Sequence, residues 1–528
     1  METQLTEEQV ERLVVLELVR NLMDNCPKLN KQDLMMTMYN SRDNCPEWAI
    51  NEIYLERGIA VEEKEKQEDK AIEALQKEIY FLLLAEKRDE ATEAMVQYVL
   101  KEHHIFTIKD DDKPEMFMYS QGIYVRNAET TIRQILRRLL MQVYKESIVV
   151  QVVKKLQADT YIEYDLFMKR DNNNEVPVLN GILNVLTLEL KPFTPYKRFF
   201  NKCPVVYDPG KKCPHIDKFL GDILSNPDDR KVYYEIGGYS LIDEYLFEKA
   251  FMFHGDGRNG KGKSLELIKR VVGAENCYSL PLSSLESNNP NIWQIHNKKI
   301  NLAGDISNND LKDTGLFKSM TGRDQITVPR KYHPSFTFVN SAKFVFACNE
   351  LPMVYDTSVG FWDRWVLLDF PYRFQPQEEF DILGKDVPSN WKLREEGIID
   401  RIATSDELSG LLNAFLEGLQ RLLKQRHFSS TVGSEDIKNL WIRKANSFMA
   451  FCFDFLDEAY DGKIDKRELR AKYSKYCKKY KLKGKSDIVI KIALQEVFGA
   501  DEDSSYESMS NKQTRCWTGI KWKDGVKL

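Results

Sequence analysis

The sequence predicts an α/β fold in which a parallel sheet and its crossover helices carry a glycine-rich loop. Three observations lead to this prediction. Residues 251–273 read as an apolar strand, a glycine-rich loop and an amphipathic helix in immediate succession. Strand-like and helical stretches alternate from about residue 235 to residue 375. Within that region polar side chains end two further strands, at Asp305 and Asn349.

Length and composition limit the classes of protein to consider. At 528 residues the chain is too long for one core, which suggests about three or four domains. Its net charge is −5, so any nucleic-acid binding has to come from local basic patches. The nine cysteines show no disulfide or zinc spacing. The acidic start has no signal-peptide core, and no apolar run reaches bilayer length. We therefore expect a cytoplasmic protein with reduced cysteines and no membrane contact.

The pattern before the glycine-rich loop changes from helical to mixed. Residues 1–95 place apolar side chains at helical spacing within highly charged sequence, which predicts helices. Short strand-like stretches with turn residues between them follow, and then two helices are predicted over 215–242. The predicted strands of this region cover residues 122–127, 160–168 and 181–193.

The central region is expected to form the parallel sheet, and mainly helical sequence follows it. Residues 376–435 look helical, and the chain ends with helices and a tryptophan-bearing stretch at 515–523 that is a candidate β-wing. The predicted strands of the central sheet cover residues 246–253, 299–304, 342–348 and 365–370.

The glycine-rich loop has the layout of a phosphate-binding loop, and it fits that motif in two registers. The full pattern G-x-x-x-x-G-K-[ST] runs from Gly257 to Ser264 and uses Lys263. A looser fit starts at Gly255 and uses Lys261. The first glycine should follow the strand directly, as Gly255 does, so we favour Lys261. A purely structural glycine turn is the alternative.

Backbone N–H groups of such a loop wrap phosphates, and the positive N-terminus of the following helix adds to the attraction. In the favoured register Ser264 lies in the first helical turn, where it approaches a metal ion only if that turn is distorted. The predicted nucleotide-binding residues are Gly255, Asp256, Gly257, Arg258, Asn259, Gly260, Lys261, Gly262, Lys263 and Ser264.

Three more residues complete a nucleotide-hydrolysing site. Asp305 ends a strand, where a carboxylate can hold Mg²⁺ directly or through water. Asn349 ends another strand and can orient the attacking water, although Asn before a loop often only caps a turn. Arg364, 15 residues after Asn349, can supply a cation for the transition state. A lone arginine is more often a surface residue, so the prediction depends on the ordered set.

Together these residues resemble the superfamily 3 helicases, and specifically the primase-helicases of poxviruses, phages and plasmids. The resemblance covers about residues 90–375. Its motifs are the glycine-rich loop and its flanks, the segment holding both Asp305 and Asn349, the segment around Arg364, and an upstream stretch. These motifs span residues 254–273, 300–352, 360–374 and 180–224.

The resemblance implies an AAA+-type motor that uses ATP and Mg²⁺, forms a homo-hexameric ring and acts on single-stranded and forked DNA. By position Lys261 is the Walker A lysine, Asp305 the Walker B acid, Asn349 the sensor asparagine and Arg364 the arginine finger. The implied domains are a helical N-terminal region (1–95), a primase-helicase N-terminal-type domain (96–230), the ATPase core (231–375), a helical connector (376–435) and a winged-helix-like DNA-binding domain (436–528).

The chain departs from the family pattern at three points. Ser307 stands two places after Asp305, where a second acid is usual, so the general base is open and Asp310 is an alternative. Gly262 replaces the expected hydroxyl residue, which weakens the magnesium assignment. No polymerase-type primase domain is evident, so priming would need a separate protein.

Two regions are candidate DNA contacts. The resemblance places Lys331 and His333 on a pore hairpin, where a cation meets phosphate and a ring stacks; an ordinary exposed hairpin is the alternative. Residues 463–485 hold eleven Lys or Arg against two acids, with tyrosines interleaved. This stretch suggests backbone contacts through Lys475, Lys478 and Lys479, or else a solvated basic face.

Three functions compete at this point. The leading hypothesis is an ATP-dependent DNA helicase that replicates a virus, plasmid or other mobile element. A non-enzymatic origin-binding or scaffold protein with a weakened ATPase is the second, suggested by Gly262 and Ser307. A small-molecule kinase shares the loop but needs neither the asparagine–arginine pair nor the basic tail.

Overall fold

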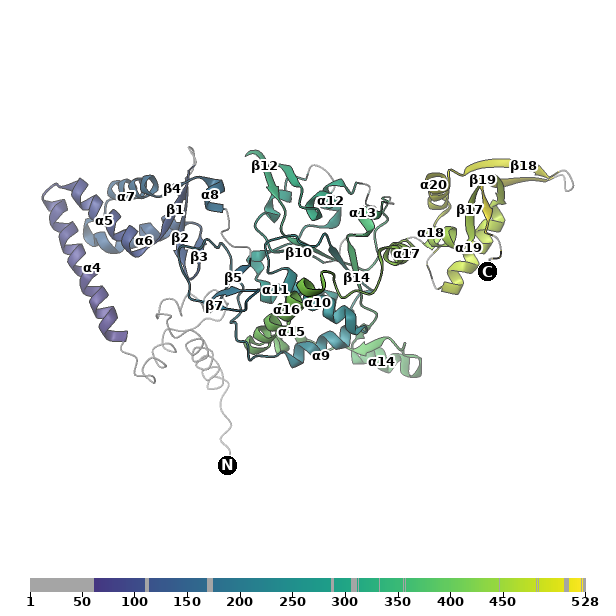
Figure 1. Cartoon of the computed structure of the whole chain (residues 1–528), viewed down its shortest axis with the longest axis horizontal. Helices are drawn as coiled ribbons and strands as arrows, with labels where there is room; N and C mark the ends of the chain where they lie inside the picture. Colours follow the sequence, from purple (N-terminus) through teal and green to yellow (C-terminus); the bar gives the residue numbers. More distant parts are fainter. Residues whose placement is uncertain are drawn as a thin grey trace, which may run out of the picture.

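The computed structural model shows an elongated chain with a helical unit at the N-terminal side, a central sheet and a smaller C-terminal unit (Figure 1). The helices expected before residue 61 lie outside the described residues. The structure describes residues 61–109, 114–168, 174–285, 289–304, 311, 313–331, 333–354, 356, 358–445, 447–480, 482, 484–507, 512–523 and 525.

The central sheet has five parallel strands in the order β14-β8-β13-β10-β9, as expected for an α/β fold. Its inner strands are nearly continuous apolar runs and are buried, which is typical of parallel strands covered on both faces. All four predicted strands are present, although the first begins at Ala250 instead of residue 246. The strands are β8 (Ala250–His254), β9 (Cys277–Tyr278), β10 (Ile300–Ala303), β13 (Lys343–Cys348) and β14 (Trp365–Asp369).

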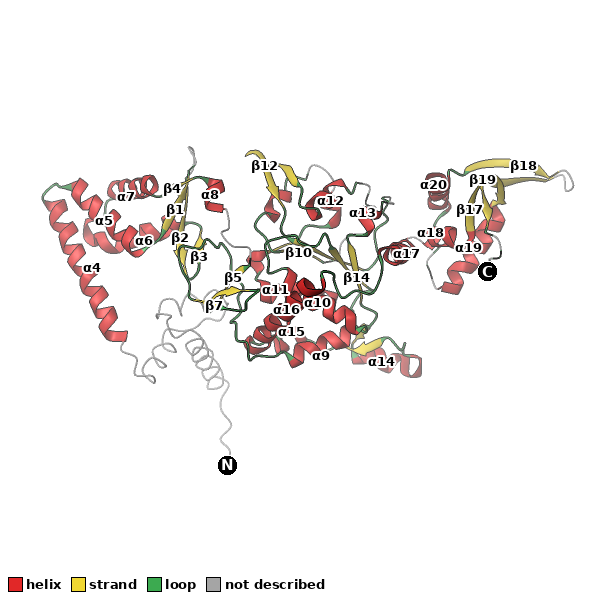
Figure 2. Cartoon of the chain, viewed as in Figure 1, coloured by secondary structure: helices red, strands yellow, loops and turns green. Residues whose placement is uncertain are grey.

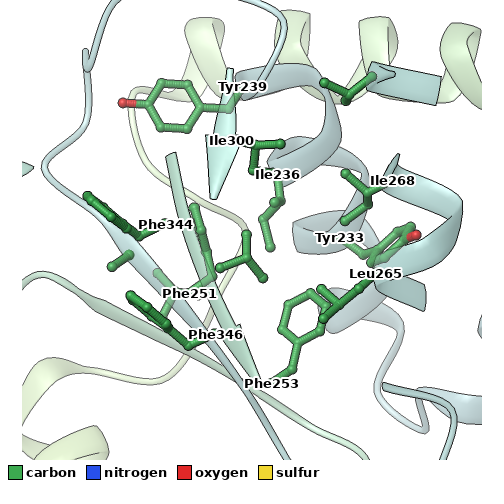
Figure 3. Packing of buried hydrophobic residues seen from close by; sticks show 14 of the residues in the cluster. Tyr233, Ile236, Tyr239, Phe251, Phe253, Leu265, Ile268, Ile300, Phe344 and Phe346 are labelled. Carbon is green, nitrogen blue, oxygen red and sulfur yellow. The ribbon is translucent and has the colours of Figure 1, made fainter. Parts of the chain in front are cut away.

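Helices cover both faces of the sheet (Figure 2). Figure 3 shows side chains of α10 and α11 packing against Phe251, Phe253 and neighbouring strand residues. On the other face Phe317 of α12 stacks on Trp365, with ring centroids 4.9 Å apart. The helices of this part are α9 (Pro214–Ile223), α10 (Pro227–Tyr239), α11 (Lys261–Val272), α12 (Gly315–Thr321), α13 (Val359–Trp362), α16 (Ser405–Gln425) and α17 (Ser434–Ala445).

A β-hairpin projects from the central part between α12 and β13 (Figure 1). It consists of β11 (Gln325–Arg330) and β12 (His333–Val339), paired antiparallel. The region predicted as helical over 376–435 also holds a short strand, because β16 (Trp391–Leu393) pairs in parallel with β15 (Arg373–Gln375). Its helices besides α16 are α14 (Gln377–Leu383) and α15 (Ile398–Ile402).

In the described residues the N-terminal side combines the helices α4 to α8 with a small sheet of order β3-β2-β1-β4, followed by a second sheet of order β5-β6-β7. The prediction of a single strand over 160–168 is wrong. The strand β4 has only two residues, and the helical turn α8 follows it. That turn buries Phe167 against Phe106, Phe117 and Tyr124. The elements are α4 (Val61–Leu84), α5 (Arg88–Glu102), β1 (Ile105–Ile108), β2 (Glu115–Ser120), β3 (Ile123–Val125), α6 (Ala128–Leu140), α7 (Glu146–Asp159), β4 (Tyr161–Ile162), α8 (Tyr164–Met168), β5 (Glu175–Val178), β6 (Gly181–Asn184) and β7 (Leu190–Lys191).

The C-terminal unit has its own apolar core, made by three helices and an antiparallel sheet of order β17-β19-β18. The candidate β-wing at 515–523 falls mostly within β19. The elements are α18 (Ser447–Phe455), β17 (Leu456–Asp465), α19 (Lys466–Tyr480), α20 (Asp487–Phe498), β18 (Asp501–Glu507) and β19 (Lys512–Trp522). Across the described part of the chain, no helix combines the length and apolar character needed to cross a membrane.

Candidate nucleotide site

Two glycines shape the loop that follows β8. Gly255 comes directly after the last strand residue, and a Cβ there would lie 2.4 Å from the carbonyl oxygen of Phe370. Gly260 has φ +91°, in the left-handed region that favours glycine, and a Cβ there would lie 2.6 Å from Cγ2 of Ile223. The backbone therefore follows a path that no larger residue could take at either position.

Lys261 begins α11 and points back into the loop. Its side chain is almost fully buried, and its Nζ lies 3.0 Å from Oδ1 of Asn349 and 3.2 Å from Oδ1 of Asn259. The ammonium also donates to the carbonyl of Gly255. A buried ammonium requires such acceptors, and all of them lie at one edge of the sheet. Two predicted site residues, Lys261 and Asn349, are thus brought together from positions 88 residues apart.

The other residues of the alternative register face elsewhere. Lys263 is exposed and pairs with Glu266, one turn further along α11, at 3.0 Å. The Ser264 hydroxyl is buried and donates to the carbonyl of Lys261 at 2.7 Å. This hydroxyl is therefore committed to its own helix, and the geometry does not favour Ser264 as a metal ligand.

The predicted metal carboxylate cannot be placed. Asp305 lies outside the described residues, as do Ser307 and Asp310. The preceding strand, β10, ends at Ala303, beside β13 and at the same sheet edge as Asn349. Within the part of the chain that the structure describes, no group of three or more His, Cys, Asp or Glu could hold a metal ion. The proposed Mg²⁺ site therefore depends on the sequence alone.

Arg364 lies at the opposite edge of the sheet from Lys261. Arg364 immediately precedes β14, which runs parallel to β8. It therefore lies at the amino ends of these two strands, whereas the loop follows the carboxyl end of β8. Five strand residues separate the two edges by roughly 15 Å. Its guanidinium donates to Thr321 at 2.9 Å and to Glu248 at 2.8 Å. The structure therefore does not bring Arg364 to the loop of its own chain.

A cavity of about 560 Å³ lies beside the loop. Arg258, Gly260 and Lys263 form its loop side, and Phe219, Phe374 and Ile398 contribute apolar surface. A pocket with mainly apolar walls and a few polar groups, next to the predicted phosphate-binding loop, is suited to a planar base.

A cluster that sequence reasoning missed adjoins the loop. His254, Asp369 and Lys444 meet there: the Nδ1 of His254 lies 3.0 Å from Oδ1 of Asp369, and the Nζ of Lys444 lies 3.0 Å from each of these atoms. Burial raises the pKa of Asp369, but hydrogen bonds to His254 and Lys444 outweigh it and leave the pKa below the usual value. Burial and the nearby Asp369 raise the pKa of Asp229 to about 6. No local sequence signal joins His254 to Lys444, which lie 190 positions apart.

The hairpin residues are partly described. Lys331 is exposed at the hairpin turn, and His333 begins β12, but the side chain of His333 lies outside the described residues. Arg330 was not singled out from the sequence. Its guanidinium carbon lies 4.6 Å from the ring centre of Trp293 and 5.5 Å from that of Phe336, so two aromatic rings hold the base of the turn.

The basic helix α19 has two different faces. Lys475, Lys478 and Lys479 are exposed, as a backbone contact with DNA requires. Tyr473 and Tyr476, two of the interleaved tyrosines, are almost completely buried in the C-terminal core and are not part of this exposed surface. The helical period explains this difference, since the two tyrosines are three residues apart on the inner face.

Fold and site together define an α/β protein with a glycine-rich loop after β8, the layout expected of a P-loop core. Two family models match the chain: "D5 N terminal like" over residues 32–225, and a "Family of unknown function (DUF5906)" over residues 253–364. These families are typical of superfamily 3 primase-helicases, so the resemblance is confirmed. The second match begins in β8 and ends at Arg364.

Individual proteins are more distant. Putative helicase L207/L206 of Acanthamoeba polyphaga mimivirus is 27% identical over 193 residues, and the match covers 35% of this chain and 19% of that protein. The apo C-terminal region of NrS-1 covers 80% of this chain and 98% of its own at 13% identity, with a TM-score of 0.40. A JCV helicase covers 60% of this chain and 84% of its own at 12% identity, with a TM-score of 0.23. Both TM-scores are too low to establish a shared fold.

Proposed function

We propose that the protein is an ATP-dependent DNA helicase of superfamily 3 that acts as a hexameric ring in the replication of a virus, plasmid or other mobile element. The observation that carries the proposal is the contact between the buried Lys261 ammonium and Asn349 at the mouth of a glycine-rich loop. A lysine that contacts terminal phosphates and an amide that orients water belong together in a hydrolytic site.

Each part of the site has a proposed task. The backbone from Gly255 to Gly260 and the N-terminus of α11 hold the phosphates, and Lys261 neutralises their charge. Asn349 positions the attacking water, and Asp305 would hold Mg²⁺, which stabilises the charge on the transferring phosphoryl group. The cavity beside Arg258 accepts the base.

The position of Arg364 supports assembly. Because it stands at the far edge of the sheet from its own loop, it can serve as a transition-state cation only for a neighbouring subunit. A ring that places the amino edge of one sheet against the carboxyl edge of the next provides that arrangement. We propose a homo-hexamer in the cytoplasm, with priming supplied by a separate protein.

DNA contacts are proposed at two places. Lys331 and His333 would contact a single strand inside the ring. Lys475, Lys478 and Lys479 on α19, in a C-terminal unit that we propose is winged-helix-like, would contact the duplex backbone of a fork.

ATP hydrolysis with and without single-stranded DNA, together with unwinding of a labelled fork, tests the proposal. We expect DNA-stimulated hydrolysis and unwinding, both abolished by Lys261→Ala. Fork binding without hydrolysis would favour the alternative, an origin-binding or scaffold protein with a weakened ATPase. That alternative is supported by the Ser264 hydroxyl, which is committed to its own helix.

A further inference from the structure

The helix α17 (Ser434–Ala445) lies between the central sheet and the C-terminal unit (Figure 1). Two adjacent residues of this helix belong to different cores. Trp441 is buried in the large central cluster, whereas Ile442 packs against the core of the C-terminal unit. A displacement of one core relative to the other therefore has to move or strain this helix.

On the side of the central sheet, α17 is anchored close to Asn349. The Trp441 indole is 1% exposed and donates to the carbonyl of Pro352 at 2.8 Å. Pro352 is three residues after Asn349. The same indole packs on Trp365 of β14, with ring centroids 4.9 Å apart. This anchor attaches the helix to the loop that carries the proposed water-orienting amide.

One turn further along, Lys444 contacts the ends of the two strands β8 and β14, outside the proposed nucleotide-binding residues. It lies 3.0 Å from both His254 and Asp369, and His254 immediately precedes Gly255. Burial raises the pKa of Cys348 to about 12, while Lys261 and Lys444 both act in the opposite direction. The Lys261 ammonium itself lies 3.0 Å from Oδ1 of Asn349, the residue after Cys348.

On the other side, the neighbouring Arg443 contacts the C-terminal unit. Its two terminal nitrogens lie 3.0 and 2.5 Å from the two oxygens of Asp454, a bidentate pair. Asp454 also accepts a hydrogen bond from the Tyr476 hydroxyl at 3.0 Å. Tyr476 belongs to α19, the helix that exposes Lys475, Lys478 and Lys479. A continuous set of contacts thus joins the basic helix to the loop.

We propose that α17 couples DNA binding at the C-terminal unit to ATP turnover, through Arg443 and Asp454 on one side and Lys444 and Asp369 on the other. Lys444 and Arg443 are positioning residues in this proposal. It rests on the proposed function, because it needs a protein that hydrolyses ATP and binds DNA. Lys444 and Asp369 are both substantially exposed, so their ion pair contributes little to stability, and removing it should leave the fold intact.

The test measures kcat and KM for ATP with and without saturating forked DNA in the full chain. The variants are Lys444→Gln, Arg443→Gln and the charge-conserving Lys444→Arg, with Lys438→Gln on the same helix as the matched control. We expect Lys444→Gln and Arg443→Gln to keep basal hydrolysis, melting temperature and fork affinity close to wild type. Each should reduce the DNA-dependent change in kcat/KM on the order of 5-fold or more. Lys444→Arg should restore that change, and the control should not alter it.

Full DNA stimulation in both glutamine variants would overturn the coupling while leaving the proposed function in place. Lost stimulation accompanied by a large fall in melting temperature, with no recovery in Lys444→Arg, would show a merely structural contact and also overturn it. A wild-type protein that hydrolyses no ATP under any condition would instead refute the proposed function, and the coupling with it.

Discussion

Lys261 and Lys263 stand two positions apart but have opposite surroundings. The first is buried among the acceptors of the loop and touches Asn349, whereas the second is exposed and pairs with Glu266 along its own helix. Both side chains are lysines, so the difference in their surroundings comes from their positions relative to the end of β8. The assignment of a role to either side chain stays a prediction that kinetics has to test.

The first prediction concerns this pair. Lys261→Ala should abolish ATP hydrolysis. Of the two lysines, Lys261 is the one whose ammonium group contacts the loop carbonyl of Gly255 and the side chain of Asn349. Lys263→Ala should retain a substantial fraction, since the Lys263 ammonium pairs with Glu266 beside the cavity and not with the acceptors of the loop. Steady-state ATPase rates of both variants, each with its melting temperature as a check of folding, give the measurement. The reverse pattern of rates would establish the later register.

A second prediction tests the register without any activity assay. Gly260→Ala should lower stability on the order of 1–3 kcal/mol, because its φ of +91° and the nearby Ile223 both oppose a side chain. Gly262→Ala is the matched control: nothing lies within 4 Å of a Cβ there, and alanine in a helix is favoured by about 0.5 kcal/mol. Urea denaturation of the nucleotide-free protein measures both. Equal destabilisation of the two variants would contradict the loop described above.

At the scale of elements, the β11–β12 hairpin and α19 differ in the kind of DNA contact they can make. The hairpin presents Lys331 at an exposed turn. The neighbouring Arg330 packs its guanidinium group against the rings of Trp293 and Phe336. The helix α19 presents a row of lysines backed by buried tyrosines, a rigid surface without exposed stacking rings at Tyr473 and Tyr476. The hairpin therefore suits contact with a DNA strand that moves through the ring, and α19 suits fixed contacts with DNA phosphates.

The third prediction separates these two contacts. Neutralising Lys475, Lys478 and Lys479 to Gln should weaken fork binding and lower its salt slope by about 2 to 3 if all three contact phosphate, since each contact contributes about 0.7 to 0.9. Basal ATP hydrolysis should stay near wild type. Lys331→Ala should instead abolish DNA-stimulated hydrolysis and unwinding while fork binding persists.

Salt titrations of fork affinity and a parallel unwinding assay measure both effects. A control that neutralises the exposed Lys77 on α4, Lys87 just before α5 and Lys101 on α5 changes the net charge equally and should leave the slope unchanged. If this control flattens the slope as much as the α19 variant does, the effect is one of net charge, and α19 is not a phosphate clamp.

At the scale of the whole molecule, the two edges of the central sheet carry different parts of one proposed reaction. Lys261 and Asn349 lie at the carboxyl edge, and Arg364 lies at the amino edge. Neither edge is complete in one chain. The hexamer and the division of the chain into five domains both stay predictions.

The fourth prediction follows from this separation. A trans-acting arginine contributes on the order of 10³-fold to turnover, so Arg364→Ala should be nearly inactive by itself. Mixing it with Lys261→Ala subunits should restore part of the activity, because some interfaces regain an intact lysine and an intact arginine. ATPase rate against mixing ratio, with assembly confirmed by light scattering, is the measurement.

Because Arg364 also pairs with Glu248 inside its own subunit, folding needs a separate check. Glu248→Gln removes that internal ion pair and keeps both Lys261 and Arg364, so this variant should hydrolyse ATP without being mixed with any other subunit. No recovery of activity at any mixing ratio of assembled subunits would contradict a site shared between subunits.

The sequence by itself predicted the strand–loop–helix that lies at 250–272, four of the five strands of the central sheet (all but β9) and the order of the candidate site residues. Each depends on neighbouring residues: a buried strand is a local apolar run, and a phosphate loop is a local glycine spacing. The same reasoning could not show that Tyr473 and Tyr476 lie on the buried face of α19 and not on its exposed face. Burial depends on which elements pack against the helix.

Only the tertiary structure decided which distant side chains meet. It brought Lys261 to Asn349, placed Arg364 at the far edge, and set Lys444 against His254 across 190 residues. It also committed the Ser264 hydroxyl to its own helix, a hydrogen bond that the motif alone does not reveal. The physical reason is that such contacts depend on how strands and helices pack against one another in space. A pattern of neighbouring residues predicts each strand or helix, but not which distant elements come together.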